Sequence, residues 1–521
     1  MLMILWNKVK EKPMEIALAL LLAIQVFLIA LSNLTLIDQN LDPDVAKLLK
    51  HAIAMWEEKT LAIPQWVYVS TLELDCTTLF ALPLYGLTKN IFLASSLSNI
   101  ILTLIFIRVI FLLFEGSDPL YPLMCANLIC IPYRVGTLDY YNMMFFSGAQ
   151  YIVKVSIPLL LIGLLLLAER EKNLTKNMRF WIFSALYLIL LAVSSLSSGV
   201  YVVACGLIPV FVVYLFYKFI IWKRVPVPVF VLFGLSILCI SGGMTANKMI
   251  LGETKAGSMV FCSLYATLDN VTSCFFGLFE LIGGNTTDFD FVIFSVDGII
   301  MLSKCCLMIA FLICGAFAFV KCIKKRGDLR LKLLLSVFVW NYFILNVSST
   351  RYGAITFEYR YHLMGLIPLM CVTVVIMIQW FRSLSNIQQK WLFWCVFAAF
   401  LVFQGLVFRE VFIRGEQNSS IKELIAYVDD TDLEAVYVYY PSGAPDICRL
   451  LDGDRLYLEV NDAGITPRVL DYYSQYIGAP VITENAIVAV SGDKGDRFEL
   501  GGYSMIRFDS VDIWTLYYFA N

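Results

Sequence analysis

The sequence predicts a polytopic α-helical membrane protein with a small α/β domain at its C-terminal end. Of the 521 residues, 60% are hydrophobic and only 15% are charged, and the mean hydropathy is +0.76. Soluble domains are about 45–50% apolar. Apolar runs of about 18 or more residues recur along the chain, and each is long enough to cross a bilayer as a helix. From residue 416 onward the sequence has no such run.

About eleven apolar runs qualify as membrane-spanning helices. The first is too long for the hydrophobic part of a signal peptide and lacks a small-residue cleavage site, so we interpret it as a retained span. The predicted spans are 14–36, 92–114, 118–133, 143–168, 180–196, 200–220, 226–242, 297–320, 332–349, 361–381 and 391–413.

The charges of the connecting loops predict the orientation. A cytoplasmic N-terminus assigns 18 Lys and Arg to the inner segments and 8 to the outer loops, although the outer loops are more than twice as long. Basic residues accumulate on the cytoplasmic side of membrane proteins. With an odd number of spans the C-terminal end is extracytoplasmic, and we expect the membrane to be a bacterial plasma membrane.

The chain is expected to divide into a transmembrane domain, 1–415, and a soluble extracytoplasmic domain, 416–521. The second domain shows strand-length apolar runs that alternate with helical patterns, which is typical of an α/β domain. It has 18 Asp and Glu against 7 Lys and Arg. The predicted strands are 435–440, 486–490, 503–508 and 513–519, and the predicted helices are 420–428 and 467–476.

The loop between the first two spans, 37–75, is long and acidic. Asp42, Pro43 and Asp44 form a strong helix start, with Asp as the N-cap, Pro at the first position and Asp at the second. The following residues predict an amphipathic helix over 43–59 whose apolar face rests on the outer leaflet. The apolar segment 77–88 is too short to cross and is expected to be a second juxtamembrane helix at the interface.

This arrangement resembles the GT-C superfamily of membrane glycosyltransferases, such as protein O-mannosyltransferases, oligosaccharyltransferases and the aminoarabinose transferase of lipid A. Those proteins have an acidic motif just after the first span, two juxtamembrane helices in the first outer loop and, in many cases, a soluble outer C-terminal domain. The resemblance implies a polyprenyl-phosphate-linked sugar donor, a lipid, glycan or protein acceptor, and transfer that is normally inverting.

For such chemistry a carboxylate must take or hold the proton of the acceptor. We predict Asp42 or Asp44 for this role, with Glu73 or Asp75 as a supporting acid. Each residue also has a structural interpretation, since Asp42 can be only an N-cap and Asp44 only a first-turn acid that complements the helix dipole. Two acids so close could also bind a divalent metal, Mg²⁺ or Mn²⁺, as the resemblance to oligosaccharyltransferases suggests.

A cation must stabilise the charge of the leaving phosphate. The predicted outer loop before the tenth span contains Arg351, Glu358, Arg360 and His362, and the forked donors of Arg suit phosphate. Arg134 is a second cation on the predicted outer side. The structural alternatives are ion pairs and an aromatic belt.

Lys47 and His51 follow Asp44 on the same face of the predicted helix. They could meet a phosphate as supporting residues, but we favour solvation of the helix surface as their role.

Two other functions remain open at this point. A lipid-linked oligosaccharide flippase would show internal repeats or charges in the middle of spans, and neither is evident in the sequence. A polymerase of the O-antigen type shares the chemistry but normally places its long loop late in the chain. The net charge of −2 gives no indication of nucleic-acid binding, and membrane lipids are the expected surroundings.

Overall fold

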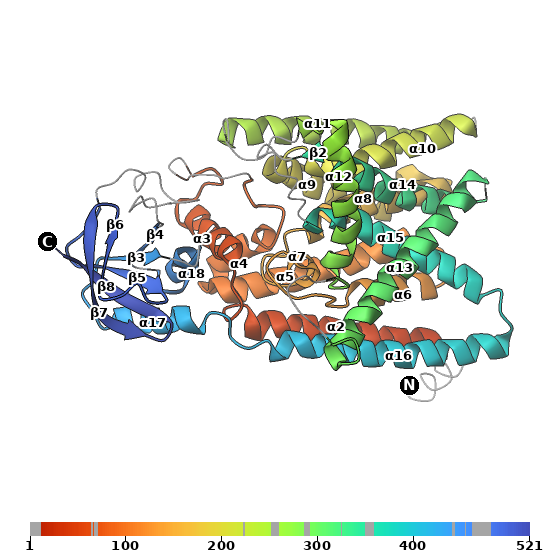
Figure 1. Cartoon of the computed structure of the whole chain (residues 1–521). Coiled ribbons are helices and arrows are strands. Elements are labelled where there is room, and N and C mark those ends of the chain that lie inside the picture. Colours follow the sequence, from red (N-terminus) through yellow and green to blue (C-terminus); the bar gives the residue numbers. More distant parts are fainter. Residues whose placement is uncertain are drawn as a thin grey trace. The chain divides into compact units, whose positions relative to one another are not determined.

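The computed structural model describes residues 12–63, 66, 71–221, 224–251, 260–285, 292–324, 326–349, 359–439, 443–453, 455–460 and 481–520. The chain forms two compact units (Figure 1). The first contains residues 1–32, 71–77 and 99–413. The second contains residues 33–70, 78–98 and 414–521. The second unit therefore combines most of the first predicted outer loop with the C-terminal segment.

Ten helical segments within the described residues are long and apolar enough to cross a membrane. They agree with ten of the predicted spans. Eight are α2 (Pro13–Leu36), α5 (Ile91–Leu113), α8 (Ile152–Arg170), α9 (Met178–Ser198), α11 (Val227–Leu251), α13 (Val296–Ile323), α14 (Leu329–Val347) and α16 (Asn386–Ile413). The other two begin with a short turn of a different helix type, namely Val203–Leu207 before α10 (Ile208–Ile220) and Tyr359–His362 before α15 (Leu363–Phe381).

The predicted span 118–133 differs, because its helix α6 runs only from Leu120 to Ile129. Ten residues rise about 15 Å, half the thickness of the hydrocarbon core. Polar contacts fix α6 to α2, since Gln25 Nε2 donates to the Asn127 carbonyl at 2.8 Å and Asn127 Nδ2 donates to the Leu18 carbonyl at 2.9 Å. Hydrogen bonds of this kind hold helices together in apolar surroundings.

The first unit has further elements that the sequence did not predict. The helix α12 (Leu264–Leu281) lies between the predicted spans 226–242 and 297–320, and it begins with Ser263 as N-cap. Strand β1 (Val260–Phe261) pairs antiparallel with β2 (Ser348–Ser349). Helix α7 (Tyr140–Met144) lies between α6 and α8, and a single 3₁₀ turn (Leu174–Lys176) precedes α9.

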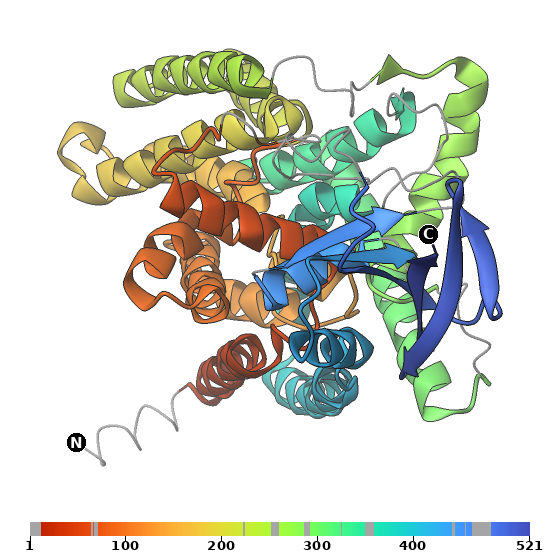
Figure 2. The ribbon, with the colours of Figure 1, turned by 90° about the vertical axis from the view of Figure 1, so that its left-hand side faces the viewer.

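The second unit contains a six-stranded mixed sheet in the order β4-β3-β5-β8-β7-β6, drawn in blue in Figure 2. Strand β3 is parallel to β4 and β5, and the remaining neighbours are antiparallel. The strands are β3 (Ala435–Tyr439), β4 (Leu456–Val460), β5 (Ala486–Ser491), β6 (Arg497–Leu500), β7 (Tyr503–Val511) and β8 (Trp514–Ala520). Buried side chains such as Tyr437, Val488 and Tyr517 form its core.

The small α/β domain predicted from the sequence is thus confirmed. The four predicted strands correspond to β3, β5, β7 and β8, and the predicted helix 420–428 is α17 (Ser419–Asp429). The predicted helix 467–476 lies outside the described residues. The sequence did not predict β4, β6 and helix α18 (Ala444–Leu451). Each of them is short, and β6 is a largely polar edge strand.

Two further helices of the second unit come from the first half of the chain. They are α3 (Pro43–Glu57) and α4 (Thr78–Thr88), which are the two predicted juxtamembrane helices. They pack against each other, and α3 also packs against α18. The prediction that the apolar face of α3 rests on the lipid surface is therefore wrong, because other parts of the protein cover α3 on more than one side.

Candidate functional site

The start of α3 has the geometry that its sequence predicts. Asp42 is the N-cap, and its Oδ1 accepts a hydrogen bond from the Val45 backbone N–H at 3.0 Å. This residue is only 6% exposed. The side chain of Asp44, two residues further along the chain, is 47% exposed, and its Oδ1 lies 3.7 Å from the Nζ of Lys47. The two predicted catalytic acids therefore differ in access, and Asp44 is the one that a second molecule can reach more easily.

The C-terminal segment supports this helix start. Gly443 precedes α18 with φ of +83°, and a Cβ at that position would lie 2.5 Å from Cγ of Pro43. Further along α3, Lys50 Nζ donates to the Arg449 carbonyl of α18 at 3.2 Å. Glycine is required at position 443 for two reasons. Its backbone is left-handed, and the ring of Pro43 approaches it too closely for a side chain.

Charged side chains of α18 lie near Lys47. Asp446 forms an ion pair with Arg449. Burial raises the pKa of the Asp446 carboxyl, while the charges of Arg449 and Lys47 act in the opposite direction. Lys47 therefore interacts with carboxylates of both α3 and α18, and its side chain is only 14% exposed.

His51 contradicts the prediction of a solvated side chain. It is 2% exposed, and its ring lies 4.7 Å from the ring of Trp66. Burial, and then the charge of Lys47, lower the pKa of His51 to about 4. The helical pattern placed His51 on the polar face, but this side of α3 is covered by the rest of the second unit. A neutral His51 is a packing residue of the fold.

The described residues do not fit a dedicated metal site at the acidic motif. Among them, no group of three or more His, Cys, Asp and Glu side chains lies close enough to hold an ion. Asp42 is buried and uses one oxygen for the helix cap. Magnesium can be bound by one or two carboxylates together with substrate phosphates, but here Asp44 is the single exposed carboxylate of the pair. We therefore derive no chemical step through a metal.

Asp75, the second acid at the end of the loop, lies in the first unit and is fully buried. Its carboxylate pairs with Lys154 Nζ at 3.3 Å and accepts hydrogen bonds from Ser194 Oγ at 2.7 Å and Ser198 Oγ at 2.9 Å. The serines are in the last turns of α9, and Lys154 is in the first turn of α8. The acid thus joins the loop to the ends of two helices.

Glu73, two residues earlier, has a strained backbone with φ of +52°. The backbone on both sides of it is fixed to Ser197, because Leu72 N–H donates to the Ser197 carbonyl at 3.2 Å and Leu74 N–H donates to Ser197 Oγ at 2.9 Å. A non-glycine residue in this conformation costs about 1–3 kcal/mol, and such residues are enriched at functional sites. Of the two supporting acids, Glu73 is the more accessible.

Arg134 is the centre of a charged cluster in the first unit. Its Nε lies 3.1 Å from Asp139 Oδ2, and its NH1 forms an ion pair with Glu280 of α12. Tyr359 donates its hydroxyl to Asp139 Oδ1 at 2.9 Å, and the Arg134 guanidinium lies 5.6 Å from the Tyr359 ring. Burial disfavours the charge of Arg134, but Asp139 and Glu280 outweigh burial and raise its pKa.

The structure thus brings together the segment of Arg134 and the segment of Arg360, which the sequence analysis treats as separate candidates. Arg360 follows Tyr359 directly, so the Arg134 cluster fixes the turn that contains Arg360. Arg360 is partly exposed, and its guanidinium lies 5.6 Å from the ring of Tyr361. His362 is 1% exposed and stacks on Tyr342 at 6.1 Å between ring centroids. The other two predicted residues of this loop, Arg351 and Glu358, lie outside the described residues.

Sequence reasoning missed the partners of these acids and bases. Lys154 is an exception to the expectation that spans have no charge near the middle, because it lies well inside the predicted span 143–168. An ionisable residue inside an apolar run is a signal for a buried polar contact. Glu280, which the structure pairs with Arg134, also stands in an apolar stretch and carries the same signal. Ser194 and Ser198 gave no signal, since serines are common in membrane helices.

Comparison with known proteins identifies the fold. No protein-family model and no curated protein matches the sequence. The fold is similar to that of a solved structure, ArnT from Cupriavidus metallidurans bound to undecaprenyl phosphate. The TM-score is 0.54 and the identity 10%, over 96% of this chain and 97% of that chain. The protein has the GT-C fold. The similarity extends over nearly the full length of both chains, so the fold that the acidic loop and the span pattern indicated is confirmed.

Proposed function

We propose that the protein is an integral membrane glycosyltransferase that transfers a sugar from a polyprenyl-phosphate-linked donor to a cell-envelope glycan, lipid or protein. The observation that supports this most directly is the GT-C fold over nearly the full chain, shared with a structure that contains undecaprenyl phosphate. The exposed carboxylate of Asp44 at the start of α3 provides a group for the chemistry.

We further propose that the reaction takes place on the outer side of the membrane. Helices α3 and α18 pack together in one unit, so the first loop and the C-terminal segment lie on one side. Helix α2 crosses the membrane between the N-terminus and the first loop. The N-terminus and the C-terminal segment are then on opposite sides, so the total number of membrane crossings must be odd. Because ten long apolar segments are found among the described residues, the segment 118–133 with α6 is our candidate for a further crossing. The charge distribution puts the N-terminus inside.

In the proposed reaction Asp44 is the general base. It accepts the proton of the acceptor while the acceptor oxygen or nitrogen forms a bond to the anomeric carbon of the sugar. The bond between that carbon and the phosphate oxygen breaks, and its electron pair stays on the polyprenyl phosphate. A single displacement of this kind inverts the anomeric centre. Asp42 holds the first turn of α3 in place, and Glu73 is the candidate for a second acid that contacts substrate.

Arg360 is the proposed partner of the donor phosphate, together with Arg351 of the same loop. Arg134 is less suited to attract an anion, because it contacts the two carboxylates of Asp139 and Glu280, and the three groups together have a net charge of −1. We propose that Arg134 acts by positioning the Tyr359–Arg360 turn. The leaving phosphate then gains its stabilising charge from Arg360 as the bond breaks.

The experiment that tests the proposal combines lipid identification with single substitutions. Lipids that copurify with the full-length protein are identified by mass spectrometry, and we expect a polyprenyl phosphate that carries one sugar. With that donor supplied, Asp44→Asn should lower turnover at least 100-fold while donor binding is retained. Asp42→Asn should keep the fold, because Asn caps helices as well as Asp does. Glu57→Gln at the other end of α3 is the control with the same loss of charge.

The proposal fails if Asp44→Asn turns over as fast as the control, or if only bulk phospholipid copurifies under conditions that preserve added donor. A copurifying lipid-linked oligosaccharide would instead favour a flippase or polymerase.

A further inference from the structure

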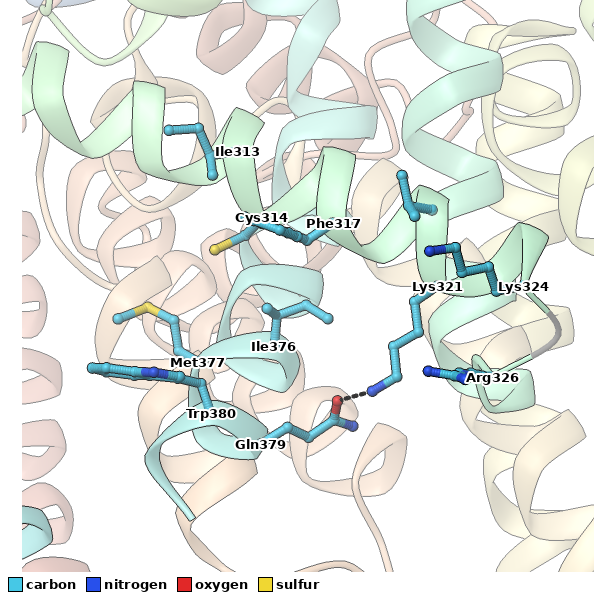
Figure 3. Close-up of a pocket in the computed structure, with 11 residues that line it drawn as sticks. Ile313, Cys314, Phe317, Lys321, Lys324, Arg326, Ile376, Met377, Gln379 and Trp380 are labelled. Atoms are coloured by element: carbon cyan, nitrogen blue, oxygen red, sulfur yellow. Dashed lines mark hydrogen bonds between the residues drawn. The ribbon is translucent and has the colours of Figure 1, made fainter. Parts of the chain in front are cut away.

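A cavity of about 630 Å³ lies in the first unit between α13 and α15. Figure 3 shows that its lining has two distinct parts. Three basic side chains and Gln379 gather at one end, and apolar side chains of both helices form the rest. The volume is within the range of about 300–1,000 Å³ that is usual for ligand sites in proteins.

The basic end consists of Lys321, Lys324 and Arg326. Lys321 Nζ donates to Gln379 Oε1 at 2.5 Å. None of these three cations forms an ion pair with any residue that the structure describes. Asp328, the acid nearest in the sequence, is occupied as the N-cap of α14, where its Oδ1 accepts from Leu331 N–H at 2.8 Å. The lining therefore has a formal charge of +3 with no acid in it.

The apolar part runs along the helices away from this basic end. Ile313 and Phe317 of α13 face it, and Met377 and Trp380 of α15 face it from the other side. Phe317 is 64% exposed and Trp380 is 54% exposed. From Ile313 to Lys324 the helix rises about 16 Å. The cavity is thus polar at the ends of two spans and apolar towards their middle. A phospholipid has the same order, with a polar headgroup followed by apolar acyl chains.

We propose that this cavity binds an anionic phospholipid of the inner leaflet, such as phosphatidylglycerol or cardiolipin. The headgroup phosphate contacts Lys321, Lys324 and Arg326, and an acyl chain lies along Phe317 and Trp380. A free phosphate would use only the basic end and leave the apolar wall unexplained. The positive-inside rule assigns this loop to the cytoplasmic side, where basic pockets between spans bind anionic headgroups. This site is independent of the acidic loop and of the proposed transfer reaction.

The test is lipid titration of the purified full-length protein in a neutral detergent, followed by native mass spectrometry. Phosphatidylglycerol should be retained at lower concentration than phosphatidylcholine, which has no net charge. The double variant Lys321→Gln/Arg326→Gln should bind phosphatidylglycerol about 30-fold more weakly, which is about 2 kcal/mol at 1.4 kcal/mol per tenfold. The single variant Lys321→Arg, which keeps the charge, should retain phosphatidylglycerol binding.

A matched control removes the same charge from the same predicted side. Lys172 and Lys176 are exposed and lie in another inner segment, so Lys172→Gln/Lys176→Gln should leave phosphatidylglycerol binding within about twofold of the unchanged protein, as expected for screened surface charges. Equal weakening in both double variants would overturn the proposal, as would equal retention of phosphatidylcholine. Displacement of the lipid by glycerol phosphate at equal concentration would also overturn it, because the site would then recognise a soluble anion.

Discussion

Breaking the contact between Asp75 and Lys154 should strongly destabilise the first unit. The two side chains are 3.3 Å apart, Asp75 is fully buried and the side chain of Lys154 is 13% exposed. The attraction is about 5 kcal/mol at an effective dielectric constant of about 20. Desolvation offsets much of this attraction in the intact pair. Removing one partner leaves the other charge buried alone, which costs about 3–5 kcal/mol.

Asp75→Asn and Lys154→Met, separately and together, form a double-mutant cycle for this contact. Each single variant should lose about 3–5 kcal/mol of unfolding free energy. The double variant should lose about 2 kcal/mol less than the sum, because neither charge then remains alone. The measurement is unfolding of the purified protein in mixed micelles with increasing denaturing detergent, followed by tryptophan fluorescence.

The ion pair between Arg179 and Glu115 is a suitable control in the same unit. Its atoms are 2.8 Å apart, which is closer than in the buried pair, but the Arg179 side chain is 70% exposed. The corresponding cycle should give a coupling below about 1 kcal/mol. If the buried pair gave no more coupling than this exposed pair, the reasoning from burial would be refuted.

Two further predictions concern the second unit. Because the folded-state pKa of His51 is lowered to about 4, the unfolded chain takes up the proton first, so stability should fall as the pH drops from about 6.5 towards 4. Between pH 7.5 and pH 5 the protein should lose about 2 kcal/mol that a His51→Gln variant does not lose, and equal pH profiles would contradict a buried neutral imidazole. Gly443→Ala should cost about 1–3 kcal/mol more than Gly453→Ala, measured by the same unfolding assay. Both glycines have positive φ, but a Cβ at Gly443 would lie against Pro43 while one at Gly453 would meet nothing within 4 Å, so equal losses would show that the contact is unimportant.

The sequence by itself determined the features that depend on local pattern. The length and apolarity of the spans are properties of single segments, and ten of them were predicted at positions that overlap the observed helices. The start of α8 and the end of α11 differ most from the prediction. The start of α3 was likewise predictable, because an N-cap followed by proline acts through its own backbone. Four strands of the C-terminal domain followed from short apolar runs bounded by turn residues.

Only the tertiary structure decided which of the predicted site residues lie together and which of them are accessible. Asp75 meets Lys154 and Ser194, and Arg134 meets Glu280, because particular helix ends pack side by side. His51 was placed on the polar face by its spacing, yet the packing of the second unit buries it. Burial and ion pairing depend on contacts between segments far apart in the chain. The periodicity of one segment shows which of its faces is apolar, but it contains no information about what will cover the other.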